Sequence, residues 1–291
     1  MFELFRDNVG LFTCVALFFG LLVGSFLNVV IYRLPKMLEN TWNHQCQIQL
    51  NLIEEETPPP VFNLVVPHSA CPNCQAPIRP WQNIPIVSYI FLKGACAKCG
   101  THISIRYPLV ELLTGILFAM VAWKFGVGLP ALGGMLFSAF LVSMIFIDAD
   151  TQLLPDNLTL PLLWFGLALS LFETYISVKE AVIGAMVGYL FLWIIFWLFK
   201  ILTKKEGMGY GDFKLLAALG AWLGVAPLLV VILLSAILGF FYYGLIIMTS
   251  KQKTEHKNIP FAFGPSLACA GWIAFMYGKN ILSWLYPNVQ F

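Results

Sequence analysis

Residues 207–212 read Gly-Met-Gly-Tyr-Gly-Asp, and the rest of the chain is organised around this stretch. Three glycines in five positions give a backbone that can turn tightly and let another group approach closely. Asp212 follows them and begins an apolar segment that runs from Phe213 to Leu223. An acid at the boundary of an apolar segment is costly, which indicates either a functional carboxylate or a helix N-cap that accepts backbone N–H groups. A second acid at the same membrane boundary would favour the functional interpretation.

The composition is that of a membrane protein. The 291 residues are 59% hydrophobic and only 11% charged, whereas soluble domains are about a quarter charged. The apolar runs are continuous rather than alternating, which is typical of helices and not of a β-barrel. We therefore predict an all-α polytopic membrane protein with about eight transmembrane helices. The predicted spans are residues 10–32, 107–124, 129–148, 157–175, 179–201, 212–224, 226–249 and 264–286. The sixth is short, so it either crosses tilted or forms a tight hairpin with the seventh.

Lysine and arginine predict the orientation, because cytoplasmic loops carry an excess of both. If the N-terminus is outside, thirteen of the seventeen Lys and Arg residues fall in inside loops and four fall outside. We therefore expect both termini outside the cytoplasm. The chain then divides into a first transmembrane helix (residues 1–35), a cytosolic insert (residues 36–106) and a membrane core (residues 107–291).

The insert carries two Cys-x-x-Cys pairs, Cys71 with Cys74 and Cys96 with Cys99. Two such pairs about 20 residues apart match a four-thiolate tetrahedral zinc site. The alternative is two disulfides, which are rare in the reducing cytosol. We expect one zinc ion per chain in a structural role, because four thiolates leave no open position for water or substrate. Residues 40–57, which include an acidic run, are expected to form a solvated loop.

The second acid lies where the third span ends, at Asp148 or Asp150, with Asp156 following a few residues later. The third span begins outside and the sixth begins inside, so the predicted topology brings these acids and Asp212 to one membrane face. Two aspartates that share a proton can activate water for attack on a peptide bond.

Asp148 is the predicted partner of Asp212. Asp156 follows a proline and precedes a span, as an N-cap would. Asp150 is about 200° round the helix from Asp148, so both cannot face Asp212. We expect Asp148 to hold the shared proton, because it lies in a partly apolar setting at the negative end of a helix dipole, while Asp212 lies at a positive end.

The motifs resemble those of the GxGD aspartic membrane proteases and, within them, the type IV prepilin peptidases. The resemblance runs nearly from end to end of the chain. It is carried by residues 147–148 (Ile-Asp), 154–159 (Leu-Pro-Asp-Asn-Leu-Thr), 209–212 (Gly-Tyr-Gly-Asp), 24–35 (Gly-Ser-Phe-Leu-Asn-Val-Val-Ile-Tyr-Arg-Leu-Pro), 83–85 (Asn-Ile-Pro) and 106–115 (Arg-Tyr-Pro-Leu-Val-Glu-Leu-Leu-Thr-Gly).

This resemblance implies an enzyme of the bacterial inner membrane with two activities. The first cleaves the short basic leader from type IV prepilins and type II secretion pseudopilins just after a glycine. The second methylates the new N-terminal amino group with S-adenosylmethionine. By matching positions, the catalytic pair falls on Asp148 and Asp212, the zinc ligands fall on the four paired cysteines, and the insert is associated with methyl transfer. The implied partners are these substrates and the lipid bilayer, with no nucleic acid.

Two other functions remain open. An ion or proton transporter would also bury acids, but at mid-bilayer depth on broken helices, whereas these acids lie at the inner boundary. A protease without methyl transfer would use the zinc insert only for docking. Glu111, inside the second span, is either paired with a neighbouring helix or part of a methyl-transfer or substrate site. Asn28 and Arg33 fit packing and topology roles, Arg33 as a positive-inside anchor.

Overall fold

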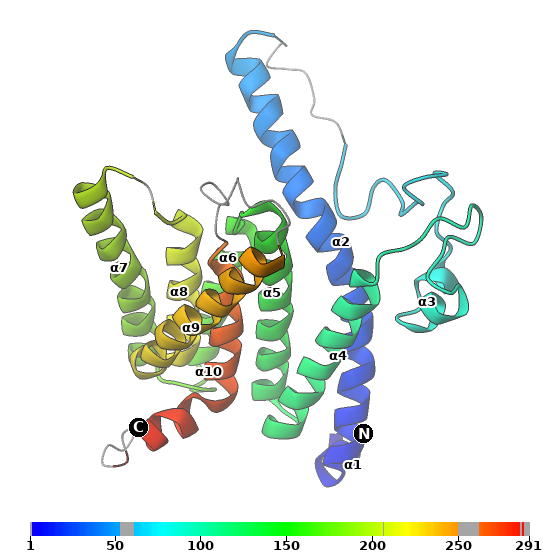
Figure 1. Cartoon of the computed structure of the whole chain (residues 1–291). Coiled ribbons are helices and arrows are strands. Elements are labelled where there is room, and N and C mark those ends of the chain that lie inside the picture. The colour runs from blue at the N-terminus through cyan, green and yellow to red at the C-terminus, as the bar shows by residue number, and fades with distance from the viewer. Residues whose placement is uncertain (1, 53–60, 206, 250–261, 286, 288–291) are drawn as a thin grey trace. The chain divides into compact units, whose positions relative to one another are not determined.

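The structure, a computed structural model, describes residues 2–52, 61–205, 207–249, 262–285 and 287. These ranges contain helices and two isolated β-bridges but no β-strand. The helices are α1 (Phe2–Asp7), α2 (Val9–Gln49), α3 (Val87–Phe91), α4 (Arg106–Phe125), α5 (Leu129–Thr151), α6 (Asp156–Ser170), α7 (Val178–Thr203), α8 (Tyr210–Leu223), α9 (Val225–Thr249) and α10 (Gly264–Leu285), with a 3₁₀ turn at Pro80–Asn83. They are labelled in Figure 1.

The prediction of an all-α membrane protein is confirmed. Four of these helices, α2, α4, α5 and α7, are long and apolar enough to cross a membrane, and α9 contributes a shorter apolar stretch, Val225–Phe241. Helices α6, α8 and α10 occupy the other predicted segments, where crossing stays a prediction. Gly224, with φ of 76°, ends α8, and α9 begins at the next residue. The short sixth segment is therefore joined to the seventh by a sharp break at Gly224, and the choice between a tilted crossing and a hairpin stays a prediction.

Helix α2, which contains the first predicted span, is longer than the sequence suggested. It begins after Asn8, whose side chain accepts the N–H of Leu11 at 3.0 Å, and continues through Pro35 to Gln49. The predicted loop is therefore wrong for residues 40–49, while the acidic run lies outside the described residues. Proline removes one backbone donor, but residues 36–49 are rich in Lys, Met, Leu, Glu and Gln, which are strong helix formers.

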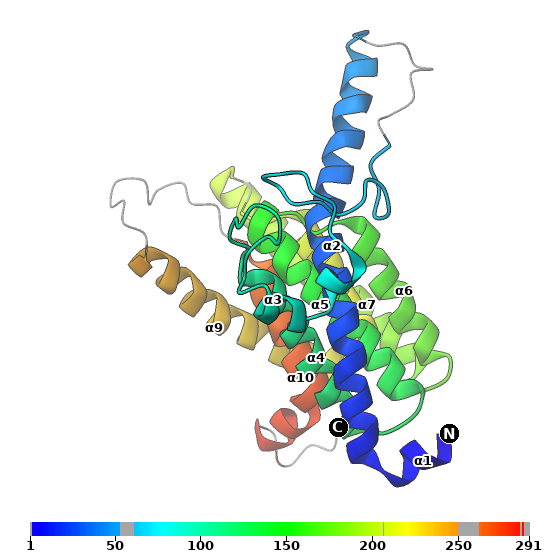
Figure 2. The ribbon, with the colours of Figure 1, turned by 90° about the vertical axis from the view of Figure 1, so that its right-hand side faces the viewer.

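Residues 1–135 form the first of two compact units, in which α2 packs along α4. Glycines let the two backbones touch. A Cβ added to Gly24 would lie 2.7 Å from the Cα of Glu111, and one added to Gly20 would lie 2.8 Å from the Cα of Gly115. Small residues at such contacts are typical of helix pairs in membranes. Residues 61–105 form the cysteine insert, which lies in front of α2 in Figure 2 and includes α3.

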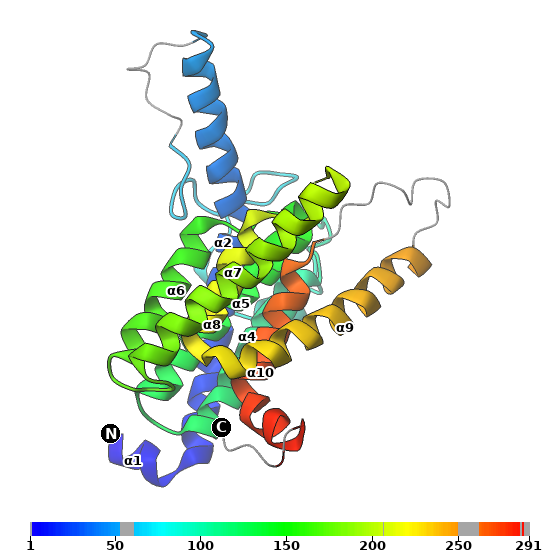
Figure 3. The ribbon, with the colours of Figure 1, turned by 90° about the vertical axis from the view of Figure 1, so that its left-hand side faces the viewer.

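Residues 136–291 form the second unit, which is built around α8. All residues of α8 from Asp212 to its end except Lys214 are buried, beneath α6, α7, α9 and α10. Gly184 of α7 meets the backbone of Gly220 directly, so these helices can approach closely. Trp222 donates its indole N–H to the Leu162 carbonyl at 2.8 Å. In Figure 3, α9 runs obliquely across α10. The helix that begins at the Gly-x-Gly-Asp motif is therefore surrounded by other helices of the second unit.

Candidate active site and metal centre

Asp148 and Asp212 are both buried, at 5% and 7% exposure. Asp148 lies in the last turn of α5, and Asp212 lies in the first turn of α8. The charge of Asp148 acts directly on Asp212, so the packing brings the two predicted acids together from distant parts of the chain. Buried carboxylates are rare without a partner or a function. Their catalytic role stays a prediction.

Asp212 is not the N-cap of α8. The cap residue is Gly209, and the Asp212 carboxylate accepts the N–H of Gly209 from the third helical position. An acid at this position reaching back to the cap residue is half of a capping box. The N-cap interpretation is therefore wrong, although Asp212 stabilises the start of α8 from the third helical position and lies beside a second acid.

Two glycines make room for the acid pair. A Cβ on Gly264, the first residue of α10, would lie 2.5 Å from Oδ2 of Asp148 and 3.1 Å from Leu154 Cδ1. A Cβ on Gly211 would lie 2.6 Å from the Cβ of Leu154. Leu154 therefore contacts the beginnings of both α8 and α10.

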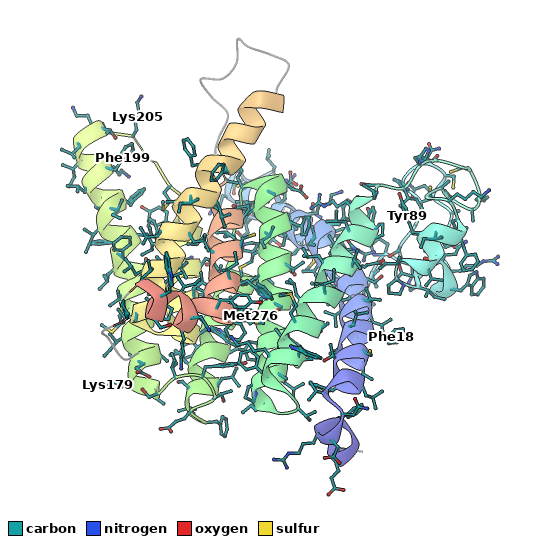
Figure 4. The ribbon with its side chains drawn as sticks, turned by 60° about the horizontal axis from the view of Figure 1, so that its bottom comes forward. Phe18, Tyr89, Lys179, Phe199, Lys205 and Met276 are labelled. Carbon is teal, nitrogen blue, oxygen red and sulfur yellow. The ribbon has the colours of Figure 1, made fainter. Side chains whose placement is uncertain are left out.

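The glycine motif also contacts the C-terminal end of α7, where Figure 4 labels Phe199. Gly207 packs against the Phe199 ring, and a Cβ on Gly207 would lie 2.8 Å from that ring.

The helix dipoles do not distinguish the two acids. The backbone N–H of Gly264 interacts with the Asp148 carboxylate, so Asp148 faces the positive end of α10. Asp212 likewise lies at the positive end of α8. The expectation that Asp148 holds the proton rested in part on the dipole of α5, and the contact with α10 removes that part of the argument. Which acid holds the proton stays a prediction.

One oxygen of the pair lacks a hydrogen bond. Oδ2 of Asp148 is buried and has no hydrogen-bond partner within the described residues. An unsatisfied buried acceptor costs about 1–3 kcal/mol. Such an atom is suited to accept a proton, a water molecule or a group of a substrate.

The two competing acids have other surroundings. Asp150 is exposed, and α5 continues through Thr151, so it faces away from the buried Asp148 as predicted. Asp156 is not an N-cap, because it lies in the first turn of α6 after the cap residue Pro155. Its two carboxylate oxygens both accept hydrogen bonds from Lys214 Nζ, at 2.6 and 2.8 Å. The Lys214 ammonium therefore pairs with Asp156 rather than serving Asp212.

The four paired cysteines of the insert converge. Their sulfurs all lie within 4.8 Å of one another, with Cys71 to Cys99 at 3.8 Å and Cys74 to Cys96 at 3.9 Å. A disulfide would need about 2.05 Å, and all four are free thiols. Tetrahedral zinc with Zn–S bonds of about 2.3 Å requires sulfurs about 3.8 Å apart. The cluster therefore has the dimensions of a four-thiolate metal site, and its sulfurs are the yellow sticks near Tyr89 in Figure 4.

Each Cys-x-x-Cys pair sits in the same kind of turn. The residue after each pair has positive φ, 55° at Gln75 and 70° at Gly100. A β-bridge closes each turn, joining Ala70 to Pro77 and Ala95 to His102. The two halves are joined by Asn73, which donates to the Thr101 hydroxyl at 2.8 Å. The insert thus consists of two matching knuckles that face each other.

Hydrogen-bond donors around the sulfurs favour thiolates. The Thr101 hydroxyl and N–H lower the pKa of Cys99 to about 6, and the N–H groups of Cys74 and Asn73 lower the pKa of Cys71. At Cys74, burial and the neighbouring sulfurs outweigh the N–H of Ala76 and raise the pKa to about 11. A bound cation would relieve the repulsion of four thiolates, which are the form that binds metal.

Three buried polar residues of the first unit have specific partners. Arg33 is buried and donates to the carbonyls of Asn63 and Pro67, and its role as a positive-inside anchor stays a prediction. Glu111 accepts the Ile86 N–H at 2.8 Å and a bond from Ser25. Asn28 donates to the Tyr107 carbonyl at 3.1 Å. Polar residues within apolar spans could be recognised from the sequence, but their hydrogen-bond partners could not.

Fold and site together define a helical membrane protein with two buried, interacting aspartates and a four-cysteine centre. Residues 18–125 match the family model described as the bacterial peptidase A24 N-terminal domain, and residues 135–244 match that of the type IV leader peptidase family. The chain belongs to the type IV leader peptidase family, as the resemblance of its motifs predicted.

Its relatives are similar over almost their whole length. The chain is 52% identical over 262 residues to the prepilin leader peptidase/N-methyltransferase of Neisseria gonorrhoeae, covering 90% of this chain and 89% of that protein. It is 49% identical over 289 residues to the protein of that name in Aeromonas hydrophila, covering 99% and 98%. With the Pseudomonas aeruginosa protein of that name it shares 51% over 270 residues, covering 93% and 92%. No solved structure matches the chain.

Proposed function

We propose that this chain is a prepilin leader peptidase and N-methyltransferase that acts on type IV prepilins and type II secretion pseudopilins. The observation that carries the proposal is the pair of buried aspartates, Asp148 and Asp212, in a chain whose nearly full-length relatives bear that name.

In the proposed cleavage, Asp148 and Asp212 share one proton. The unprotonated carboxylate takes a proton from a water molecule as its oxygen attacks the carbon of the scissile carbonyl. The protonated carboxyl donates its proton to the carbonyl oxygen, which gives a tetrahedral gem-diol. The carboxyl that took the water's proton then passes it to the leaving nitrogen, while the other carboxylate takes back a hydroxyl proton, so that the C–N bond breaks and the leader and the new amino terminus are released. The unsatisfied Oδ2 of Asp148 supports an exchange of protons at that atom, and the beginnings of α8 and α10 stabilise the negative charge of the pair.

The proposed zinc site consists of Cys71, Cys74, Cys96 and Cys99, which would hold one ion and fix the insert. Four thiolates complete a tetrahedral coordination, so the ion's role is structural. S-adenosylmethionine would supply the methyl group to the free amine that cleavage exposes. The functional division of the chain is into residues 1–35, 36–106 and 107–291, with the insert serving methyl transfer and the remaining helices serving proteolysis.

The proposed setting is the bacterial inner membrane, with the insert and the acid pair at the cytosolic face and both termini outside. The distribution of Lys and Arg supports this orientation.

Mass spectrometry of a processed pilin tests the function. Purified enzyme in lipid nanodiscs, given a prepilin and S-adenosylmethionine, is expected to yield a shortened pilin with one added methyl group at its N-terminus. A shortened but unmethylated pilin would support the protease activity and reject the methyltransferase activity. An uncut pilin, together with proton flux through the reconstituted protein, would favour the transporter.

A further inference from the structure

Two charged side chains buried in the first unit contact the cysteine insert rather than other charges. Arg33 of α2 and Glu111 of α4 are 6% and 8% exposed. Burying a charge is costly unless it is well hydrogen-bonded, and neither residue takes part in the proposed cleavage. Both find their partners in the backbone of the insert.

Glu111 holds the insert at Ile86. Its Oε2 accepts the Ile86 N–H at 2.8 Å, and Ser25 of α2 bonds to the same carboxylate. Ile86 is the N-cap residue of α3 and has a positive φ of 59°. A β-branched residue pays a steric cost in this left-handed conformation and keeps it only when the surroundings impose it. The contact with Glu111 is one such constraint.

Arg33 holds the insert at a second point. Its guanidinium donates to the Asn63 carbonyl at 2.9 Å and to the Pro67 carbonyl at 2.6 Å, and it lies 5.8 Å from the centre of the Phe62 ring. Pro67 precedes Cys71 by four residues. The first knuckle is thus attached on its N-terminal side through Arg33 and on its C-terminal side through Ile86.

We propose that Arg33 and Glu111 are positioning residues for methyl transfer, which latch the cysteine insert to the α2–α4 pair at two points. The inference rests on the proposed function, in which the insert serves methyl transfer. The four cysteines give the insert its internal shape, and the latch gives that shape a fixed orientation on the helices. Neither residue has a role in the proposed cleavage, so loss of the latch should lower methyl transfer and leave cleavage unchanged.

The first test is hydrogen exchange of the full-length protein in nanodiscs, which needs no substrate. In Glu111→Ala the Ile86 amide loses its acceptor, and the peptide covering residues 84–88 should exchange at least about tenfold faster. Glu111→Gln keeps an acceptor oxygen and should exchange as the wild type does. Thr114→Val is the matched control, because Thr114 lies one turn further along α4 and its hydroxyl bonds only to the Val110 carbonyl of its own helix.

The second test measures both reactions, with a prepilin for cleavage and a pre-cleaved pilin peptide for methyl transfer. In Glu111→Ala, methyl transfer should fall by about 10- to 100-fold, as a misplaced reacting group would cause, while cleavage and zinc content stay unchanged. Glu111→Gln should restore methyl transfer to within about threefold of the wild type, because the lost interaction is a hydrogen bond and not a charge.

Equal loss of methyl transfer in Glu111→Ala and Glu111→Gln would overturn the proposal, since the negative charge itself would then be required. Unchanged exchange at residues 84–88 in Glu111→Ala would also overturn it. If Glu111→Ala does not fold, Arg33→Met decides the same question, with faster exchange expected at residues 63–67 and Arg33→Lys restoring protection in part. A wild type that transfers no methyl group would reject the proposed function, whereas the exchange experiment would still decide the latch.

Discussion

The acid pair and the cysteine cluster solve the same electrostatic problem in different ways. Each gathers groups of like charge that repel one another. The four sulfurs come from residues at most 28 positions apart, on two matching turns, and a cation would offset their charge. Asp148 and Asp212 lie 64 positions apart and are brought together by helix packing. Two helix beginnings and, in the proposed mechanism, a shared proton offset their charge. A local site tolerates change in the surrounding helices, whereas the acid pair depends on the whole second unit.

The largest expected effect follows from removing either acid. Asp148→Asn or Asp212→Asn should lower the rate of prepilin cleavage by about 10³-fold, because the proton exchange needs both carboxyl groups. Zinc content and methylation of a pre-cleaved pilin peptide should persist, which would sharpen the separation of the two centres. Asp150→Asn serves as the control and should cleave nearly as fast as the wild type. Loss of both reactions in a folded Asp148→Asn protein would instead argue for one shared site.

The second prediction removes the zinc site of the cysteine cluster and leaves the acid pair intact. Metal analysis of the purified protein should find one zinc per chain, and Cys71→Ser or Cys96→Ser should release it and abolish methyl transfer, since metal binding and local folding are coupled. Cleavage should fall much less, because the acid pair is built by other helices. Cys46→Ser, at an exposed cysteine outside the cluster, is the matched control. Full methyl transfer in a metal-free protein would contradict the zinc assignment.

A smaller effect is expected from crowding the acid pair without removing it. In Gly264→Ala, the added Cβ would meet Oδ2 of Asp148 at 2.5 Å and displace the carboxylate. Cleavage should fall by about 10²-fold, as a shift of about 1 Å in a catalytic group can cause. Gly244→Ala in α9 adds the same atom where nothing lies within 4 Å and should leave the rate unchanged. Equal rates for the two variants would show that the closeness of α10 does not matter.

The smallest effect is expected from the ion pair beside the site. Lys214 and Asp156 are partly exposed, at 30% and 53%, and such pairs contribute at most about 1 kcal/mol. Lys214→Met should lower the unfolding temperature slightly and keep cleavage within about threefold of the wild type. Asp156→Asn should behave alike, because the two residues act on each other. A large loss of cleavage in Lys214→Met alone would mean that the ammonium also serves Asp212.

What the sequence alone determined is local. The apolar runs predicted the helices and the membrane, because hydrophobicity and length are properties of each segment. The spacing of the cysteines predicted their cluster, because two short turns fix where the four sulfurs can lie. The motifs at residues 147–159 and 207–212 identified the two acids and the family to which the chain belongs.

Only the tertiary structure decided the rest. It placed Gly264 of α10 against Asp148 and paired Lys214 with Asp156. It also showed that Arg33 and Glu111 form hydrogen bonds with the backbone of the insert. It also showed that α2 continues through Pro35. From the sequence alone, the backbone donor that proline lacks argued for a helix end, while the helix-forming residues after it argued for continuation. These contacts join residues far apart in the chain, and which polar group meets which is set by how helices pack rather than by any periodicity within one of them.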